Sequence, residues 1–252
     1  MQPGDGRARG GRERGDQLVV LHWNVHSWRD LAGQPNLDAV AGLIAARQPD
    51  VVSLTEVIEP WAAPAAIGDL ASRAGYWWMF VPAVELGGDE PARGYGNALL
   101  CRLPVLAVQQ WQLTWPPAVY HGTEPSEARS VALARIRLPA ADVWAGSTHL
   151  PLGQQARSAA LGRLAALTRS LPAPWVISGD FNTAPGNWIR PGQPVVVAPR
   201  PARPTFPARF PRRALDYTIA SPGIRMRAKP LRAAGSDHRP VLTRCQVPAR
   251  RG

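Results

Sequence analysis

The chain has 252 residues, and 45% of them are hydrophobic, which is enough apolar material for a packed core and excludes a wholly disordered protein. It contains no apolar run of about 18 residues, so we expect no membrane-spanning helix. Two cysteines, Cys101 and Cys245, are too few for a disulfide scaffold. The first 16 residues are rich in Gly and Arg and lack the apolar region of a secretory signal. We therefore expect a cytoplasmic monomer.

The formal net charge is +11, from 29 basic and 18 acidic residues. Lys229 is the single lysine, so almost all of the positive charge comes from arginine. A basic surface attracts polyanions and raises the rate of encounter with phosphates, but it does not identify the phosphate. The same arginine excess, together with abundant Ala, Gly and Pro, is typical of a GC-rich genome, so composition alone does not indicate a function.

The first ordered elements indicate an α/β domain. Residues 1–16 carry no hydrophobic periodicity and are expected to form a flexible tail, followed by a single domain over 17–248. The run 18–24 is typical of a buried strand. Asn36 is a candidate N-cap for an amphipathic helix, which ends before a second strand at 51–56. This order of strand, helix and strand favours parallel pairing.

The middle and end of the chain are rich in strands. Strand-like patterns cover 76–81, 97–101, 105–113, 130–138 and 143–149, and after one long helix at 154–170 they resume at 175–178, 214–220 and 241–247. No internal repeat or linker divides this series. Many strands with few helices predict two sheets packed face to face, with the helices on the outside.

The segment 183–213 departs from this regularity. It contains eight prolines, six arginines and no acidic residue, so we expect neither a continuous helix nor a central strand. A loop of this length inside a compact domain is usually functional or disordered.

Polar side chains stand at or near the ends of the apolar strands. They are Asn24, Glu56, His149, Asp180, Asn182, Asp216, Asp237 and His238. Such groups are costly at the ends of buried strands unless they meet partners or a metal ion, and strand ends are where sites are built in α/β sheets. Carboxylate and amide oxygens suit Mg²⁺ or Mn²⁺ rather than zinc. A hard cation beside paired histidines and carboxylates is the equipment for phosphoester hydrolysis.

Seven short motifs carry these residues in chain order. They are Trp23-Asn24, 49–57 (PDVVSLTEV), 96–100 (GNALL), 147–150 (STHL), 179–182 (GDFN), 215–217 (LDY) and 236–240 (SDHRP). In this order and spacing they resemble the endonuclease/exonuclease/phosphatase superfamily, the relatives of DNase I, exonuclease III and neutral sphingomyelinase. The resemblance spans about residues 18–247. It implies an α/β fold, a DNase I-like four-layered sandwich of two mixed β-sheets packed face to face and flanked by helices.

The resemblance also implies roles for the metal and the general base. Glu56 is expected to be the main ligand of one or two Mg²⁺ or Mn²⁺ ions, with Asn24 and Asp237 assisting directly or through water. His238 is expected to hydrogen-bond the carboxylate at position 216, and so to contact the phosphate or activate the attacking water. Asp180 would orient that water or join the metal ligands.

Two further polar residues complete the implied catalytic set. Asn182 would donate to a phosphate oxygen in the transition state, and His149 would stabilise or protonate the leaving oxygen. The glutamate that pairs with this histidine in pancreatic DNase I is missing here, and Asn97 is a candidate support in its place. His22 and His26 are interpreted as hydrogen-bonded core histidines without a role.

Four residues are candidates for substrate binding. Trp28 and Trp188 follow motif residues and could either stack on a base at the site mouth or pack within their loops. Arg129 and Arg212 border loops that are expected at the rim, where they could bind phosphates flanking the scissile one.

Together these features predict a metal-dependent phosphoester hydrolase, with cleavage of phosphodiesters in DNA or RNA as the leading activity. One alternative is a phosphodiesterase or phosphatase that acts on a small-molecule or lipid-linked phosphate. Another is a non-catalytic nucleic-acid-binding scaffold, although such proteins usually lose a metal carboxylate or the terminal histidine.

Overall fold

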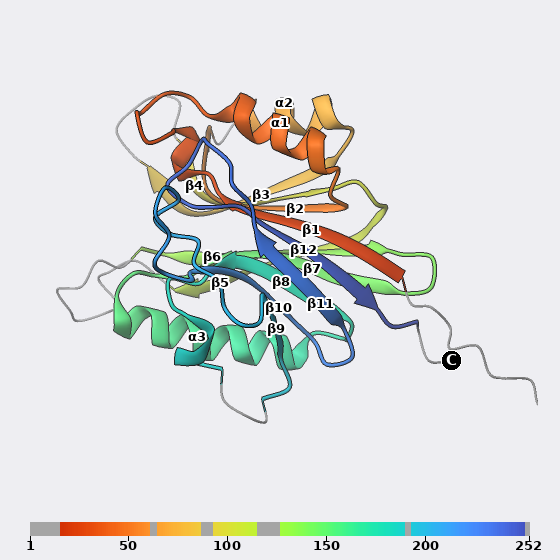
Figure 1. Ribbon diagram of the computed structural model, residues 1–252. Coiled ribbons are helices and arrows are strands. Elements are labelled where there is room, and N and C mark those ends of the chain that lie inside the picture. Colours follow the sequence, from red (N-terminus) through yellow and green to blue (C-terminus); the bar gives the residue numbers. More distant parts are fainter. Residues whose placement is uncertain (1–15, 61–64, 87–92, 115–126, 190–192, 250–252) are drawn as a thin grey trace, which may run out of the picture.

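Two six-stranded β-sheets pack face to face, with helices on both outer sides (Figure 1). This computed structural model describes residues 16–60, 65–86, 93–114, 127–189 and 193–249. Helices α1 (Leu37–Arg47) and α2 (Ala65–Ala74) cover one sheet, and α3 (Gln154–Ser170) covers the other. The predicted four-layered sandwich is confirmed.

The first sheet has the strand order β11-β12-β1-β2-β4-β3. Its strands are β1 (Asp16–Asn24), β2 (Val51–Pro60), β3 (Trp77–Leu86), β4 (Arg93–Cys101), β11 (Arg225–Pro230) and β12 (Val241–Val247). As predicted, β1 and β2 are parallel and α1 connects them, while the other neighbours are antiparallel.

The second sheet has the order β5-β6-β7-β8-β10-β9. Its strands are β5 (Val105–Thr114), β6 (Arg129–Arg137), β7 (Asp142–His149), β8 (Trp175–Asp180), β9 (Val196–Ala198) and β10 (Asp216–Ala220). Here β7 and β8 are the parallel pair, joined by α3. Each sheet therefore has one parallel pair whose carboxyl ends carry polar motif residues.

Some elements were not expected from the sequence. Helix α2 and strand β11 lie where no element was predicted, and β9 lies inside the proline-rich segment 183–213. Strand β9 has three residues and forms the edge of its sheet, the position in which nearby prolines are tolerated. Of the expected flexible tail, residues 1–15 lie outside the described part of the chain, whereas Asp16 already pairs within β1.

Asn36 precedes α1, but its side chain makes no capping hydrogen bond. Instead, Nδ2 donates to the carbonyl oxygens of Val25 at 2.8 Å and Arg29 at 3.1 Å, and to that of Gly235. Asn36 is the N-cap residue, as predicted, and its carbonyl accepts the Val40 N–H at 3.0 Å, but its side chain does not bond to the first turn of the helix. The side chain ties the start of α1 to the two segments that follow β1 and precede β12.

The space between the sheets changes from apolar to polar along its length. One part is filled by residues such as Leu18, Val51 and Val143. Another part is crossed by hydroxyl pairs that join the two sheets, with Oγ–Oγ distances of 2.8 Å for Ser53–Ser147 and 2.8 Å for the Oγ1 atoms of Thr218 and Thr243. Because buried polar groups are costly unless they are paired, these contacts favour one alignment of the sheets.

Two exclusions made from composition agree with the structure. Within the described residues, no helix has the length and apolar character needed to cross a bilayer. Cys101 and Cys245 are both buried and free.

Candidate active site

The polar residues from the strand ends converge at one end of the sandwich, where a pocket of about 550 Å³ opens. The residues from this set that line it are Glu56, His149, Asp180, Asn182, Asp237 and His238. Asn24 and Asp216 are fully buried behind the pocket wall and hydrogen-bond to lining residues. All eight sequence-predicted catalytic and metal-ligating residues therefore belong to one constellation.

Glu56 reaches the pocket because β2 is irregular at that point. The pairing of β2 with β4 shifts register between Leu54 and Val57, and Glu56 adopts a φ of 57°. Asn182, in the turn after β8, has a φ of 49°. A left-handed conformation at a residue other than Gly costs on the order of 1–3 kcal/mol and is concentrated at functional sites. Backbone strain is thus stored at these two residues of the pocket, and also at His26 and Ser27, which line it with φ values of 49° and 55°.

Asn24 holds two carboxylates at the centre of the site. Its Nδ2 donates to Glu56 Oε1 at 2.8 Å and to Asp180 Oδ2 at 3.1 Å. Its amide oxygen accepts the backbone N–H of His26 at 3.0 Å. Since the amide nitrogen rather than the oxygen faces the carboxylates, this orientation favours Asn24 as a residue that positions the acidic groups over one that ligates a metal directly.

Asp216 is the acceptor for three buried side chains. Its Oδ2 is 2.8 Å from His238 Nδ1 and accepts from Thr205 Oγ1 at 2.5 Å, while Oδ1 is 3.2 Å from His22 Nε2. Burial alone would raise the pKa of Asp216, but the two histidines beside it hold that pKa well below its usual range. The group is therefore an ionised carboxylate, as expected for the partner of a basic imidazole.

His238 is fixed by contacts on several sides. Its N–H donates to Ser236 Oγ at 3.1 Å, its carbonyl accepts from the Trp23 indole at 2.9 Å, and its ring packs against Phe206 with 4.8 Å between centroids. Burial would lower the pKa of His238, but the carboxylates of Asp216 and Asp180 raise it to about 10. At neutral pH, His238 is a hydrogen-bond donor that carries positive charge.

Excess negative charge at the pocket suits a cation. Burial raises the pKa of Glu56, and the charges of Asp180 and Asp237 add to that effect. Burial and the charge of Asp216 likewise raise the pKa of Asp180. Ligand atoms of Glu56, Asp180 and His149 all lie within 4.8 Å of one another. Carboxylates that repel each other in a buried pocket are stabilised by a hard divalent ion, so the donor set fits Mg²⁺ or Mn²⁺.

His149 is buried and neutral. Burial lowers its pKa, and the positive charge of Arg129 adds to the shift. Its Nε2 is 3.0 Å from Asn182 Nδ2, while its Nδ1 has no hydrogen-bond partner. Asn97 instead donates to the carbonyl of Ser130 at 2.9 Å. The expectation that Asn97 supports His149 is therefore wrong. Because the His149 imidazole is neutral, it carries no extra proton to give to the leaving oxygen.

Arg129 is the substrate-binding candidate that lines the pocket. It is 4% exposed, and its guanidinium lies 5.5 Å from the ring centroid of Tyr95. Nη2 forms an ion pair with Glu127 at 2.7 Å, whereas Nε has no hydrogen-bond partner. A buried guanidinium with an unpaired N–H is suited to an anionic oxygen.

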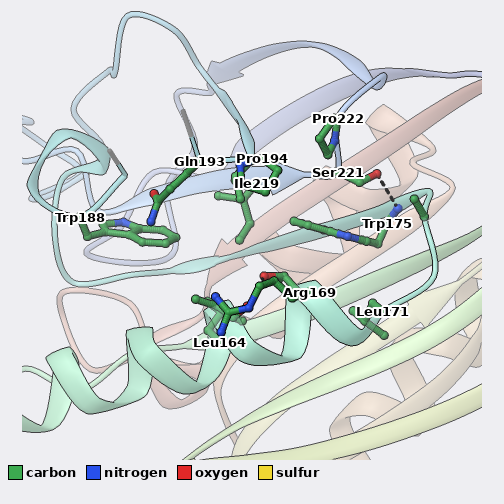
Figure 2. Close-up of a pocket in the computed structure, with 14 residues that line it drawn as sticks. Leu164, Arg169, Leu171, Trp175, Trp188, Gln193, Pro194, Ile219, Ser221 and Pro222 are labelled. Atoms are coloured by element: carbon green, nitrogen blue, oxygen red, sulfur yellow. Dashed lines mark hydrogen bonds between the residues drawn. The ribbon is translucent and has the colours of Figure 1, made fainter. Parts of the chain in front are cut away.

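Trp188 faces a different pocket. That pocket, of about 300 Å³, lies between α3 and the second sheet and is also lined by Trp175 and Arg169 (Figure 2). The Trp188 indole donates to the Tyr217 hydroxyl at 2.7 Å, and its ring stacks on Phe181 with 5.9 Å between centroids. Trp188 does not line the candidate site, so it is not placed to stack on a base at the site mouth.

The other two substrate-binding candidates also lie off the pocket wall. The indole of Trp28 donates to the carbonyl of Ile58 at 3.1 Å, and Trp28 packs against the buried cluster under α1 and α2. Arg212 is exposed, and its neighbour Arg213 lines the pocket instead. For Trp28, the loop-packing alternative fits the structure.

Sequence reasoning missed four residues near the catalytic set: His22, His26, Thr205 and Arg213. The interpretation of His26 as a core histidine is wrong, because it is half-buried and lines the pocket. His22 is two residues before Asn24 on β1, and the alternation of side chains along a strand puts both on one face, so a signal was present. Thr205 and Arg213 lie in the proline-rich segment, where no periodicity indicates which side chains turn inward.

Comparisons with known proteins identify the family and the fold. A protein-family model described as "Endonuclease/Exonuclease/phosphatase family" matches residues 21–238 of the chain. No curated protein matches the sequence. The fold is similar to that of an endonuclease/exonuclease/phosphatase protein from Beutenbergia cavernae, with a TM-score of 0.73 and 22% identity over 92% of this chain and 72% of that one.

Two further solved structures share the fold. A mannosyl-6-phosphatase from Bacteroides thetaiotaomicron has a TM-score of 0.71 and 16% identity, covering 90% of this chain and 99% of its own. TDP2 from D. rerio, in complex with a single-strand DNA product, has a TM-score of 0.66 and 19% identity, covering 91% of this chain and 98% of its own. The match over most of the sequence confirms the resemblance, and the chain belongs to the endonuclease/exonuclease/phosphatase family, whose members are phosphoesterases.

Proposed function

We propose that the protein is a divalent-metal-dependent hydrolase that cleaves phosphodiester bonds in nucleic acid. The observation that carries this proposal is the convergence of the Glu56 and Asp180 carboxylates with the Asp216–His238 pair in one pocket. Metal-binding acidic groups and a charged hydrogen-bond donor are the two components that transfer of a phosphoryl group to water requires.

The Glu56 and Asp180 carboxylates would hold the metal ion, and Asp237, which lines the same pocket, would assist. When bound, the ion would neutralise part of the phosphate charge and polarise the phosphorus–oxygen bonds. Asn24 keeps both carboxylates in place through its amide N–H groups.

The chain's own donors would bind the phosphate. Protonated His238 is suited to contact a phosphate oxygen, because Asp216 fixes the ring and stabilises its charge. The unpaired Nε of Arg129 would supply a further donor. The Nδ2 of Asn182 lies 3.0 Å from His149 Nε2 and 2.8 Å from the carbonyl of Leu150, so it would exchange one of these contacts for a phosphate oxygen. Donors that are already oriented before reaction stabilise the charged transition state without reorganisation.

As an alternative to binding the ion, Asp180 would orient and deprotonate the attacking water, with Glu56 and Asp237 left to hold the metal. A carboxylate with a raised pKa is a stronger base than an ordinary one, and the pKa of Asp180 is raised by burial and by the charge of Asp216. Because His238 is protonated at neutral pH, this assignment gives the two groups complementary roles.

The nucleic-acid preference is supported by charge and by likeness. The segment 193–213, which reaches the pocket at Phe206 and Arg213, has arginines and no acidic residue, which suits a polyanion. The structurally similar TDP2 carries a DNA product, whereas the similar mannosyl-6-phosphatase acts on a sugar phosphate. The competing activity is therefore hydrolysis of a small phosphomonoester.

The test is a substrate panel with Mg²⁺, Mn²⁺ or EDTA, comprising plasmid DNA, RNA, bis-p-nitrophenyl phosphate, p-nitrophenyl phosphate and sphingomyelin. We expect nicking of DNA or RNA and hydrolysis of the diester, both abolished by EDTA and by Glu56→Gln or His238→Ala. Asp38→Asn, on the exposed face of α1, is the matched carboxylate control and should retain full activity. Turnover of the monoester alone would reject the nuclease, and binding without turnover of any substrate would favour a scaffold.

A further inference from the structure

A short hairpin at residues 205–213 stands at the edge of the candidate site. Phe206 and Arg213 form an antiparallel bridge, and the Thr205 N–H donates to the Arg213 carbonyl at 2.8 Å. The loop is anchored on the segment that carries His238, because the Ala208 N–H donates to the Asp237 carbonyl at 2.6 Å. The 205–213 hairpin is thus built into the wall of the pocket.

The tip of this hairpin exposes a large aromatic ring. Phe210 is 67% exposed, the highest value among the large hydrophobic side chains of the described residues. The guanidinium of Arg209 lies 5.6 Å from the centroid of its ring. Because prolines 207 and 211 restrict the backbone on both sides of this ring, the ring loses little conformational entropy when it binds a ligand. Its exposure to water contributes nothing to the free energy of folding, so a role in binding is the simpler reason for its position.

The hairpin separates the candidate site from a second groove. Phe206 and Arg213 line the catalytic pocket on one side. On the other side, Arg209 lines a groove of about 740 Å³ together with Arg232 and Arg239. The two cavities adjoin at the segment 236–238, which contributes Ser236 to the groove and His238 to the pocket.

The groove is positively charged. Arg209, Arg232 and Arg239 form no ion pair within the described residues. Asp30 is the acidic residue among those that line the groove, and its Oδ1 accepts the N–H groups of Ala32 and Gln34 at 2.8 Å each. The Nε of Arg239 donates to the carbonyl of Ala208 at 2.7 Å, but guanidinium groups without an acidic partner along a groove still favour an extended polyanion.

We propose that the 205–213 hairpin and the adjoining arginine groove bind a single-stranded nucleic acid that extends out of the catalytic pocket, with one unpaired base stacked on Phe210. Basic groups along a groove with an exposed aromatic ring beside it suit a single strand, because bases offer flat faces and phosphates offer charge. A duplex keeps its bases stacked on each other and would use only the arginines.

This inference rests on the proposed function for its position beside a phosphoester-cleaving pocket, but binding can be measured without hydrolysis. The probe is a fluorescein-labelled 12-nucleotide DNA or RNA single strand, titrated with the full chain in EDTA and followed by anisotropy. We expect Phe210→Ala to weaken binding of the single strand by roughly 5- to 100-fold and to leave binding of the same sequence as a duplex within twofold. Phe210→Trp should bind at least as well as the unaltered chain.

The matched control is Trp111→Ala, which removes a ring that is 47% exposed on β5. It should leave the affinity unchanged. Arg209→Ala combined with Arg232→Ala should reduce the slope of log Kd against log salt by about 0.7 for each phosphate that is no longer neutralised. The proposal is overturned if Phe210→Ala behaves like Trp111→Ala, if the unaltered chain does not bind the single strand, or if it binds phosphatidylserine vesicles instead.

Hydrolysis of bis-p-nitrophenyl phosphate by the same variants separates the two proposals. This small diester does not reach the hairpin tip, so Phe210→Ala should hydrolyse it at the rate of the unaltered chain. Hydrolysis with no effect of Phe210 on strand binding overturns the binding surface alone. No hydrolysis by any variant, with strand binding still dependent on Phe210, overturns the enzyme and leaves the surface supported.

Discussion

His22 and His238 contact the two different oxygens of a single buried carboxylate. His22 Nε2 is 3.2 Å from Oδ1 of Asp216, and His238 Nδ1 is 2.8 Å from Oδ2. The other ring nitrogen of His22 is 3.0 Å from Ser53 Oγ, which belongs to the hydroxyl contacts between the sheets. The residue that orients His238 is therefore itself held by a histidine from the opposite sheet.

Replacing His22 should weaken both folding and catalysis. His22→Ala leaves Asp216 Oδ1 and Ser53 Oγ without this partner in the interior, which costs about 1–3 kcal/mol. Urea unfolding should show that loss, and kcat on bis-p-nitrophenyl phosphate should fall. His22→Gln keeps an amide donor and should recover part of both. Unchanged unfolding midpoints in both variants would contradict the role assigned to His22.

Stability should fall as the pH rises from about 6.5, the ordinary pKa of histidine, towards 10. The pKa of His238 is about 10 in the folded protein, so in this range the native state binds a proton that the unfolded state has lost. The stabilisation is therefore complete below pH 6.5 and decreases by at most about 1.4 kcal/mol per pH unit above it. Urea unfolding in EDTA between pH 6.5 and 9 should show a steeper decline for the unaltered chain than for His238→Gln. Parallel curves would show that the proton is not retained.

The amide of Asn182 should matter more to kcat than to folding. Asn182→Gly removes the donor while relieving the left-handed backbone at this position, where φ is 49°. Loss of one oriented donor typically costs roughly 100- to 1000-fold in kcat, and we expect a drop of that size at little change in Tm. Asn182→Ala should show the same drop in kcat together with a lower Tm, because Ala retains the backbone strain. Equal kcat values for Asn182→Gly and the unaltered chain would remove Asn182 from the catalytic set.

Gly179 is required for the close approach of β7 and β8. A Cβ at this position would overlap the carbonyl oxygen of Thr148 on the neighbouring strand, so Gly179→Ala must separate the strands that carry His149 and Asp180. We expect a loss of about 1–3 kcal/mol in stability and a large loss of activity. Gly162→Ala on α3 meets nothing within 4 Å and should stabilise by about 0.4–1 kcal/mol. Similar unfolding midpoints for the two variants would contradict this account.

The parts of the site that follow strand periodicity could be predicted from the sequence. Asp180 ends β8 after a run of apolar residues, and parallel pairing with β7 fixes where that run ends. Glu56 was expected to end its strand as well, but it lies within β2 and reaches the pocket through the irregular pairing between Leu54 and Val57. Helix α3 was predicted with its observed bounds because its apolar residues repeat at helical spacing.

The contacts made by irregular segments could not be predicted. Thr205 reaches Asp216 from a loop whose path depends on pairing between Phe206 and Arg213, and no periodic pattern encodes that pairing. The position of Trp188 in the chain allowed either stacking at the site mouth or packing within its loop, and its hydrogen bond to Tyr217 and stacking on Phe181 fit the packing alternative. Strand β11 was missed because its residues alternate only between exposed and half-buried.

Catalytic activity depends on the relative position of the two β-sheets of the sandwich. Glu56 and His238 belong to the half built around β1, and Asp180 and Asp216 belong to the half built around β8. Two of the links across that boundary, from Asn24 to Asp180 and from His238 to Asp216, are single hydrogen bonds of 3.1 and 2.8 Å between site residues. A shear of about one ångström between the layers would break them while every strand kept its neighbours. A small displacement of one sheet relative to the other should therefore abolish turnover before the circular dichroism signal of the strands and helices changes. The reaction rate then reports the alignment of the two sheets.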